Sequence, residues 1–394
     1  MRKAVALILF ASMGGALLFA QDGDRDERRE FGVERFATLP ARSLENPTPP
    51  PKRVALGHPE GLCADRKGHI YADSFEQPIG GPGGVYVQNY IYTFGHDGEL
   101  LAATPTPTGV VPLGCTVSGD KFYMNDVYGG NELEYTLPLT ETSLPVTYAI
   151  CGGFVGHPGL LCALNANYPG PDGRIYMSDN GAALFGDFIG RIWVLDPKTG
   201  SATIFLDTKA QLGVAQLPLA DYVPNLPNGT VLPYSVNGIA FSRDGSALYF
   251  ANMSTNTIYK QKVWRCWDAI NGCEPEGAAT QFSRDPRHVI QGPDNMDFDE
   301  HGNLWIASGQ DQHVVALNRE GEVVGVFGAF LGFDKAGAPR GLLQPSGVIF
   351  SKGRIYIGNE SSQTLLPVTD PIDWTKLKLF TISTIDADIL ERER

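Results

Sequence analysis

Four oxygen-bearing side chains recur at one position of an internal repeat in this sequence. Each lies eight residues before a glycine that is placed to form a tight turn, and the four are Glu60, Asn165, Asn237 and Asp294. If the repeats close into a ring, a shared position brings such side chains together. Two carboxylates and two carboxamides offer only hard oxygen ligands, which calcium and similar cations prefer. Each residue alone is typical of a turn, so it is the shared position that predicts a divalent-cation site.

Short segments rich in aromatic and aliphatic residues must position these side chains. Six of them follow glycine-containing turns, beginning at His69, Lys121, Arg174, Ala247, Asn303 and Arg354. Further apolar runs often follow, and four antiparallel strands in a unit of about fifty residues are typical of a propeller blade. The sequence therefore predicts an all-β, six-bladed β-propeller with four-stranded antiparallel blades over residues 54–385. A pair of β-sandwiches is the alternative, but it does not explain the shared position.

The composition limits the classes of partner. The chain has 394 residues, of which 43% are hydrophobic, and a formal net charge of −13. Such an acidic chain is a poor candidate for binding nucleic acid or an anionic membrane. The acidity suits a cation-binding protein, and it suits an ordinary soluble surface equally well.

The two ends of the chain differ from the repeats. Residues 1–20 combine a short basic start with an apolar run, which is typical of a cleavable signal peptide and predicts a secreted or periplasmic protein. Residues 21–53 are charged and then proline-rich, which predicts a linker or a strap across the surface. Residues 386–394 are expected to form a C-terminal tail. No other stretch of the sequence is apolar and long enough to span a bilayer.

Six cysteines are an even number for an oxidising compartment. Local pairing is preferred, which joins Cys266 to Cys273 and Cys151 to Cys162. The remaining two, Cys63 and Cys115, either pair with each other or stay as small buried thiols.

The repeats resemble the senescence-marker-protein/gluconolactonase family of six-bladed, calcium-dependent lactonases and organophosphate hydrolases. The resemblance covers roughly residues 54–360. It lies in His58-Pro-Glu60-Gly-Leu, in Asn165 with Pro171-Asp-Gly-Arg174, in Ser235-Val-Asn237-Gly-Ile-Ala-Phe, and in Pro293-Asp294-Asn-Met-Asp-Phe. It implies that Glu60, Asn237 and Asp294 bind the catalytic divalent ion, while Asn165 joins them or contacts substrate.

Roles beyond ligation follow from position. Asp294 is the candidate nucleophile or general base, because a carboxylate bound to the ion faces the substrate. His58 lies two residues before Glu60 and is a candidate base or substrate contact, with a surface histidine as the alternative. Asn295 is a candidate substrate contact or a turn residue. Polar residues at the ends of the recurring segments are expected to make turn hydrogen bonds and to take no part in catalysis; they are Asp126, Asp179, Asn180 and Asn359.

The sequence also departs from the family pattern. Sugar-lactonase members often carry an arginine two residues before the first asparagine, and this chain has Ala163 there. The departure favours aliphatic or aryl lactones or esters as substrates over gluconolactone. Two insertions, 207–236 and 261–293, are expected to act as lids or as stabilising straps. The alternatives to a hydrolase are a non-catalytic propeller that binds a small ligand or a protein, and a strictosidine-synthase-like enzyme.

Overall fold

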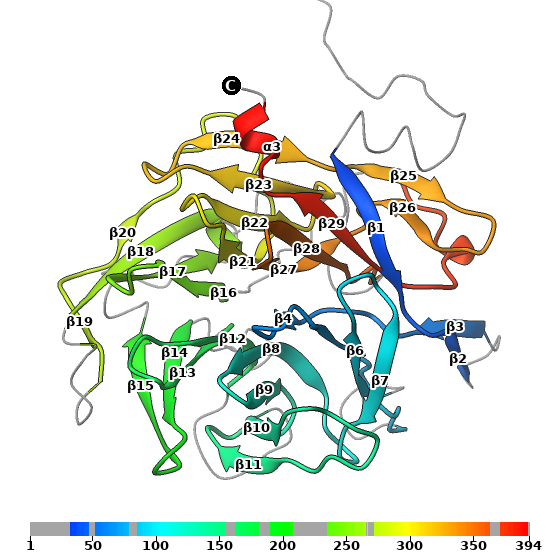
Figure 1. Ribbon diagram of the computed structural model, residues 1–394, viewed down its shortest axis with the longest axis horizontal. Coiled ribbons are helices and arrows are strands. Elements are labelled where there is room, and N and C mark those ends of the chain that lie inside the picture. Colours follow the sequence, from blue (N-terminus) through cyan, green and yellow to red (C-terminus); the bar gives the residue numbers. More distant parts are fainter. Residues whose placement is uncertain are drawn as a thin grey trace, which may run out of the picture.

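The fold is a six-bladed β-propeller, described from a computed structural model (Figure 1). The structure describes residues 32–46, 52–78, 85–153, 162–180, 190–207, 235–264, 266, 272–362 and 371–392. The predicted signal peptide and most of the 207–236 insertion lie outside these ranges, as does part of the 261–293 insertion. None of the helices in the described ranges has the length and apolar character that crossing a membrane requires.

Each blade is an antiparallel sheet, with five strands in blade four and four strands in each of the others, and one edge strand, the inner strand, lies nearest the axis. Blade one contains β4 (Leu62–Ala64), β5 (Ile70–Asp73), β6 (Tyr90–Phe94) and β7 (Leu100–Pro105). Blade two contains β8 (Pro112–Ser118), β9 (Lys121–Asp126), β10 (Asn131–Thr136) and β11 (Val146–Ala149). Blade three contains β12 (Leu164–Pro169), β13 (Ile175–Asp179), β14 (Arg191–Asp196) and β15 (Ser201–Asp207).

The second half of the ring follows the same plan. Blade four contains β16 (Val236–Phe241), β17 (Ala247–Asn252) and β18 (Thr257–Trp264), with β19 (Glu274–Pro275) and β20 (Thr280–Gln281) paired to β18. Blade five contains β21 (Pro293–Phe298), β22 (Leu304–Ser308), β23 (His313–Leu317) and β24 (Val323–Phe327). Blade six contains β27 (Pro345–Ser351), β28 (Arg354–Asn359), β29 (Thr381–Asp386) and β1 (Val33–Thr38).

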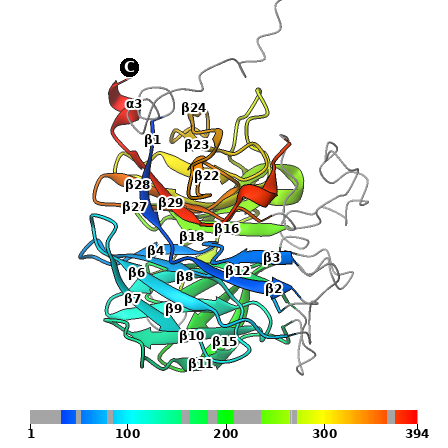
Figure 2. The ribbon, with the colours of Figure 1, turned by 90° about the vertical axis from the view of Figure 1, so that its right-hand side faces the viewer.

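The ring is closed by the two ends of the chain. Strand β1 pairs with β29, so that Val33 lies opposite Ile385 and Thr38 opposite Thr381 (Figures 1 and 2). Part of the range expected to be a linker is therefore the outer strand of blade six. The inferred propeller boundary at residue 54 is too late for this strand, whose side chains at Val33 and Ala37 are buried.

Smaller elements complete the described chain. They are the hairpin of β2 (Arg42–Asn46) and β3 (Lys52–Leu56), the hairpin of β25 (Phe330–Phe333) and β26 (Pro339–Gly341), the short helices η3 (Met253–Thr255) and η4 (Trp374–Lys376), and α3 (Ile389–Arg392). Helix α3 lies in the expected C-terminal tail, and its Leu390 is buried against blades five and six.

The apolar core is divided among the interfaces between blades. Each pair of neighbouring blades encloses its own cluster of buried side chains. The cluster between blades five and six, for example, contains Trp305 and Ile357. Burial of such clusters is the main favourable term in folding. The six turn glycines that mark the repeat all have positive φ, where glycine is favoured. These features confirm the predicted repeat.

Three disulfides connect the cysteines. The expected pairs Cys151–Cys162 and Cys266–Cys273 are present. Cys63 pairs with Cys115, the option that the sequence left open, and this bridge joins the inner strands of blades one and two.

Candidate functional site

A β-bulge lies at the start of the inner strand in five of the blades. In β16 the pairing moves three residues, from Val236 to Ile239, while the partner strand β17 moves two, from Asn252 to Phe250, and β8, β12, β21 and β27 show the same shift. A bulge of this kind redirects a side chain out of the regular alternation. The first unpaired residues are Leu113, Asn165, Asn237, Asp294 and Ser346, and Glu60 holds the corresponding place just before β4.

Small residues follow most of these positions and let the inner strands approach one another. A Cβ on Gly238 would collide with the carbonyl oxygen of Asp294, and one on Gly114 would collide with that of Asn165. Gly114 also has a φ of +78°. The pair Asn237-Gly238, which by itself is typical of a turn, is therefore part of a bulge in a packed strand.

The four predicted ligands are buried and short of hydrogen-bond donors. Glu60, Asn165, Asn237 and Asp294 have exposed fractions of 3, 5, 2 and 4%. Asn165 Oδ1, Asn237 Oδ1 and Asp294 Oδ1 have no hydrogen-bond partner within the described ranges. Glu60 Oε2 accepts a hydrogen bond from the Gly114 amide at 3.1 Å. Buried acceptors are satisfied in most proteins, so a group of unsatisfied oxygens indicates something that would complete them.

The electrostatics connect residues of different blades. Burial raises the pKa of Glu60 well above its usual value, and the carboxylate of Asp294 raises it further. Burial raises the pKa of Asp294 to about 7, against hydrogen bonds from Asn295 and the Asn237 side chain. Because Glu60 belongs to blade one and Asp294 to blade five, their repulsion acts across the ring. A cation between them would remove this repulsion.

Two further buried carboxylates were missed by the sequence analysis. Asp73, at the end of β5, accepts hydrogen bonds from the amides of Gly61 at 2.9 Å and Glu60 at 3.3 Å, and burial raises its pKa to about 7. Glu360 directly follows β28 and is 3% exposed, and burial together with Asp294 and Asp73 raises its pKa. Both sit at the ends of recurring segments. An acidic residue one place beyond such an end was the sequence signal that could have identified Glu360.

The polar residues at the ends of the second strands, which the sequence analysis expected to be turn residues, hydrogen-bond to the loops that lead into the inner strands. The side chains of Asp126, Asp179 and Asn359 accept hydrogen bonds from the amides of Val111, Ala163 and Leu343 at 3.2, 3.0 and 3.1 Å. These hydrogen bonds join residues 15 or 16 apart in the sequence, so they connect neighbouring segments of a blade and are not the local turn bonds that were expected. Asn180 differs, because its side-chain oxygen is buried without a partner in the described part of the chain.

His58 lies beside this group. Its Nδ1 is 2.8 Å from the carbonyl oxygen of Glu360, and its Nε2 is 4.0 Å from a carboxylate oxygen of Glu76. The ring packs on Phe380, with 4.3 Å between ring centroids. His58 is therefore partly buried and fixed in orientation, unlike an ordinary surface histidine.

Asn295 faces a different space. It lines a cavity of about 160 Å³ that runs from the bulges toward the far ends of the inner strands, together with Thr116, Asn167 and Asp297. Asp294, the preceding residue in the bulge, does not line this cavity, so the two side chains face different spaces. The cavity also contacts the Cys63–Cys115 bridge.

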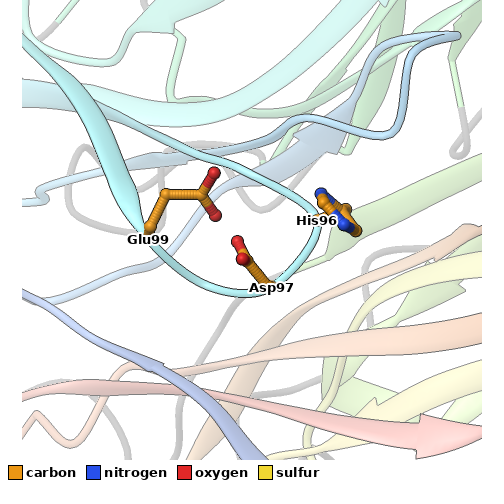
Figure 3. Close-up of side chains that lie close together, drawn as sticks. All are labelled: His96, Asp97 and Glu99. Carbon is orange, nitrogen blue, oxygen red and sulfur yellow. The ribbon is translucent and has the colours of Figure 1, made fainter.

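Two compact groups of three His, Asp or Glu side chains that could share an ion are found in the described parts of the chain, and neither includes Glu60 or Asp294. One is His96, Asp97 and Glu99 in the exposed turn between β6 and β7 (Figure 3), and the other is Glu300, His301 and Asp388. Both groups are exposed, and exposed acidic clusters are screened by solvent. They lack the burial and the unsatisfied oxygens of the ring.

Comparisons with known proteins place this geometry in context. Residues 233–328, which include blades four and five with Asn237 and Asp294, match the SMP-30/gluconolactonase/LRE-like region. No curated protein sequence matches the chain.

Solved structures share the fold at low sequence identity. A luciferin-regenerating enzyme has 13% identity and a TM-score of 0.56, covering 84% of this chain and 91% of its own. Regucalcin of Agrobacterium tumefaciens, described as a calcium-binding protein, has 14% identity and a TM-score of 0.52, covering 88% and 94%. A gluconolactonase of Xanthomonas campestris has 14% identity and a TM-score of 0.53, covering 88% and 98%. These structures show a shared propeller fold, and the resemblance to the senescence-marker-protein/gluconolactonase family is confirmed by the match in blades four and five.

Proposed function

We propose that this chain is a metal-dependent hydrolase of lactones or related esters, with a divalent cation on the propeller axis. The observation that carries the proposal is the group of buried oxygens without donors on Asn165, Asn237 and Asp294, beside the carboxylate of Glu60. All four ligands are hard oxygens, which suits Ca²⁺ best. When bound, such an ion polarises a carbonyl oxygen.

The residues around the ion have separate tasks in this proposal. Glu60 and Asp294 supply the charge that holds the dication, and Asn165 and Asn237 complete its oxygen shell. Asp294 is the candidate base or nucleophile at the substrate carbonyl. His58 is the second candidate base, since its fixed ring keeps Nε2 available to accept a proton. The backbone amides of Gly61 and Glu60, held by Asp73, fix the direction of the Glu60 side chain.

The surroundings of the ring support an apolar substrate. Leu113 occupies the blade-two position of the ring, and Ala163 lies two residues before Asn165. Both belong to a buried apolar cluster with Phe75, Val111, Val127 and Tyr128. Neither side chain can hydrogen-bond sugar hydroxyls, so we propose aliphatic or aryl lactones or esters as substrates. Asn295, which faces the inner cavity, is the weaker candidate for substrate contact.

Export is the second part of the proposal. Three disulfides are compatible with an oxidising compartment. We propose that residues 1–20 are removed during export to the periplasm or the medium. N-terminal sequencing of the protein purified from its cells should find a start after Ala20, and an intact Met1 on the exported protein would contradict this.

Chelation and restoration of the metal test the hydrolase. Elemental analysis of the purified protein should find one or more divalent cations, and EDTA should abolish hydrolysis of a lactone and ester panel. EDTA should also lower the melting temperature, because an ion that binds only the folded ring stabilises it by about 2.7 kcal/mol at 100 times its Kd. Calcium should restore both. Metal binding without turnover on the panel would favour a ligand-binding propeller, and absence of metal binding would contradict the site itself.

A further inference from the structure

Blade two departs from the repeat at one place on its third strand. In the other five blades, the third-strand residue opposite the fifth residue of the recurring segment is a fully buried isoleucine or valine. These counterparts are Ile91, Ile192, Ile258, Val314 and Ile382. Blade two has Glu132 at this place, opposite Asn125, and both side chains are 0% exposed. Departures of this kind from an otherwise consistent pattern are expected at functional sites.

The inner strand of blade three carries a second departure, two residues after Asn165. The residue at this place in the other blades is apolar, and these counterparts are Leu62, Cys115, Ile239, Met296 and Val348. Blade three has Asn167, which is 5% exposed. Asn167 Nδ2 donates to Glu132 Oε1 at 2.8 Å. The two polar exceptions are therefore bonded to each other across the interface between blades two and three.

Asn125 connects the same interface to a proposed ligand. Its Nδ2 donates to the carbonyl oxygen of Asn165 at 2.6 Å, and since a carbonyl oxygen only accepts, the orientation of the amide is fixed. The other side of this carbonyl lies against Gly114, where a Cβ would collide with it. Blade two thus holds the Asn165 backbone between an amide donor and a glycine.

The bulge in β12 depends on such side-chain support. Asn165 and Ala166 lie outside the regular pairing with β13. Ala166 is supported from its own blade, because its amide donates to the Ser178 hydroxyl at 2.9 Å and its carbonyl oxygen accepts from the same hydroxyl at 3.3 Å. The donor to the Asn165 carbonyl comes from Asn125 of blade two.

The polar side chains in this interface do not favour stability. Glu132 Oε2, Asn125 Oδ1 and Asn167 Oδ1 have no hydrogen-bond partner in the described part of the chain. A buried polar atom without a partner is destabilising, and the aliphatic counterparts in the other blades avoid that cost. What the polar group contributes is therefore to be found in the position of β12.

We propose that Asn125 and Glu132 are positioning residues of the candidate site, which hold the bulge of β12 so that Asn165 faces the cation on the propeller axis. Asn125 holds the carbonyl of Asn165, and Glu132 holds the side chain of Asn167, so blade two fixes the segment at two points. The inference rests on the proposed function. It explains why only the interface between blades two and three is polar at these places.

A triple variant tests the proposal by giving this interface the residues of blade four. Asn125→Ala/Glu132→Ile/Asn167→Ile introduces the side chains that Ala251, Ile258 and Ile239 have at the corresponding places. The melting temperature of the metal-free variant should stay close to that of wild type, because replacing both partners of a buried hydrogen bond with apolar groups is nearly neutral. The Kd for Ca²⁺, measured by isothermal calorimetry, should rise by about tenfold or more.

Combination with Asn165→Ala distinguishes positioning from a general loosening of the blades. If blade two acts through Asn165, adding Asn165→Ala to the triple variant should raise the Kd no further than Asn165→Ala does alone, since the contact is already lost. Glu132→Gln should keep the wild-type Kd, because its amide oxygen still accepts from Asn167.

Val314→Ala is the matched control. Val314 is the counterpart of Glu132 in blade five, and the next blade presents Ser346, which is not a proposed ligand. Loss of buried methyl groups should lower the melting temperature of this variant and leave the Kd for Ca²⁺ unchanged.

The outcomes are distinguishable. A wild-type Kd in the triple variant, with a raised Kd in Asn165→Ala, would overturn the inference and leave the proposed function standing. Additive increases from the two sets of substitutions would also overturn it. If the triple variant does not fold, Asn125→Ala, which removes only the donor to the Asn165 carbonyl, gives the same comparison. A wild-type protein that binds neither Ca²⁺ nor another divalent cation would remove the proposed function together with the inference.

Discussion

His58 Nδ1 lies 2.8 Å from the carbonyl oxygen of Glu360, which connects the segment before blade one to the end of β28 in blade six. A carbonyl oxygen only accepts hydrogen bonds, so Nδ1 carries the proton. In the neutral ring, Nε2 is then the nitrogen with a free lone pair. The structure thus sets the tautomer that a general base would need.

Replacing His58 with glutamine tests this role. The amide of the glutamine can still donate to the Glu360 carbonyl, but it cannot accept a proton at pH 7. Since general-base catalysis contributes about 10²- to 10⁴-fold, kcat on a good lactone or ester should fall at least a hundredfold. The Kd for Ca²⁺ should change little. An unchanged kcat and an unchanged pH profile would make His58 a packing residue on Phe380.

The proposed ligands Asp294 and Asn165 should contribute unequally to turnover and to metal binding. Asp294→Asn removes a ligand charge and the candidate base together, so it should abolish turnover and weaken metal binding. Asn165→Ala removes one neutral contact and leaves both Glu60 and Asp294, so part of the activity should remain. Steady-state kinetics and elemental analysis of both variants give the comparison. Full turnover in Asp294→Asn would contradict the metal-hydrolase proposal.

The repeat and the identities of the inner-ring residues were predictable from the sequence. The eight-residue offset from a turn glycine is a local pattern, and a closed ring turns it into a shared position in space. The bulges that direct Asn165, Asn237 and Asp294 were not predictable, because a bulge is defined by pairing with a second strand. The offset nevertheless located them, since the bulge recurs at one place in five of the blades.

Long-range pairing explains what the sequence did not reveal. Val33–Thr38 has the length and composition of a strand, but its partner β29 lies at the other end of the chain, and no local pattern specifies that pairing. The same holds for the Cys63–Cys115 bridge, which was one of two options. Glu360 was missed because the segment before it ends in Asn359, whose bracing hydrogen bonds are what a strand-end residue usually makes.

A buried glutamate outside the ring predicts a pH-dependent stability. Glu132 is fully buried, and Asn167 Nδ2 donates to its Oε1 at 2.8 Å. Burial raises the pKa of Glu132 well above its ordinary 4.5. Stability from this group is therefore fully present below about pH 4.5, where both folded and unfolded chains are protonated, and is lost as the pH rises through the folded-state pKa.

Glu132→Gln should remove that dependence. The Glu132 Oε2, Asn125 Oδ1 and Asn167 Oδ1 atoms are buried without partners in the described ranges, and Asn125 lies directly across from Glu132 in the sheet. A glutamine amide supplies donors at this place, worth about 1 kcal/mol each when a hydrogen bond forms. In thermal melts the variant should exceed wild type at pH 8, with the difference shrinking toward pH 4. A constant difference across this range, or a variant less stable at pH 8, would contradict the prediction; Glu320→Gln is the exposed control.

The Cys63–Cys115 bridge should contribute more stability than the shorter Cys151–Cys162 bridge. The first spans 52 residues and the second 11. In the chain-entropy treatment a loop of the longer length restricts the unfolded chain by about 4 kcal/mol, against about 3 kcal/mol for the shorter one. Both Cys63 and Cys115 are buried among apolar side chains, so alanine is the least disruptive replacement. Urea denaturation of the two double-alanine variants should show the larger loss of stability for Cys63→Ala/Cys115→Ala.

The Cys63→Ala/Cys115→Ala variant should also bind Ca²⁺ more weakly, because the bridge holds β4 against β8, where the Gly114 amide donates a hydrogen bond to Glu60. An equal or smaller loss of stability, with wild-type Ca²⁺ affinity, would show that strand packing alone holds blades one and two in register.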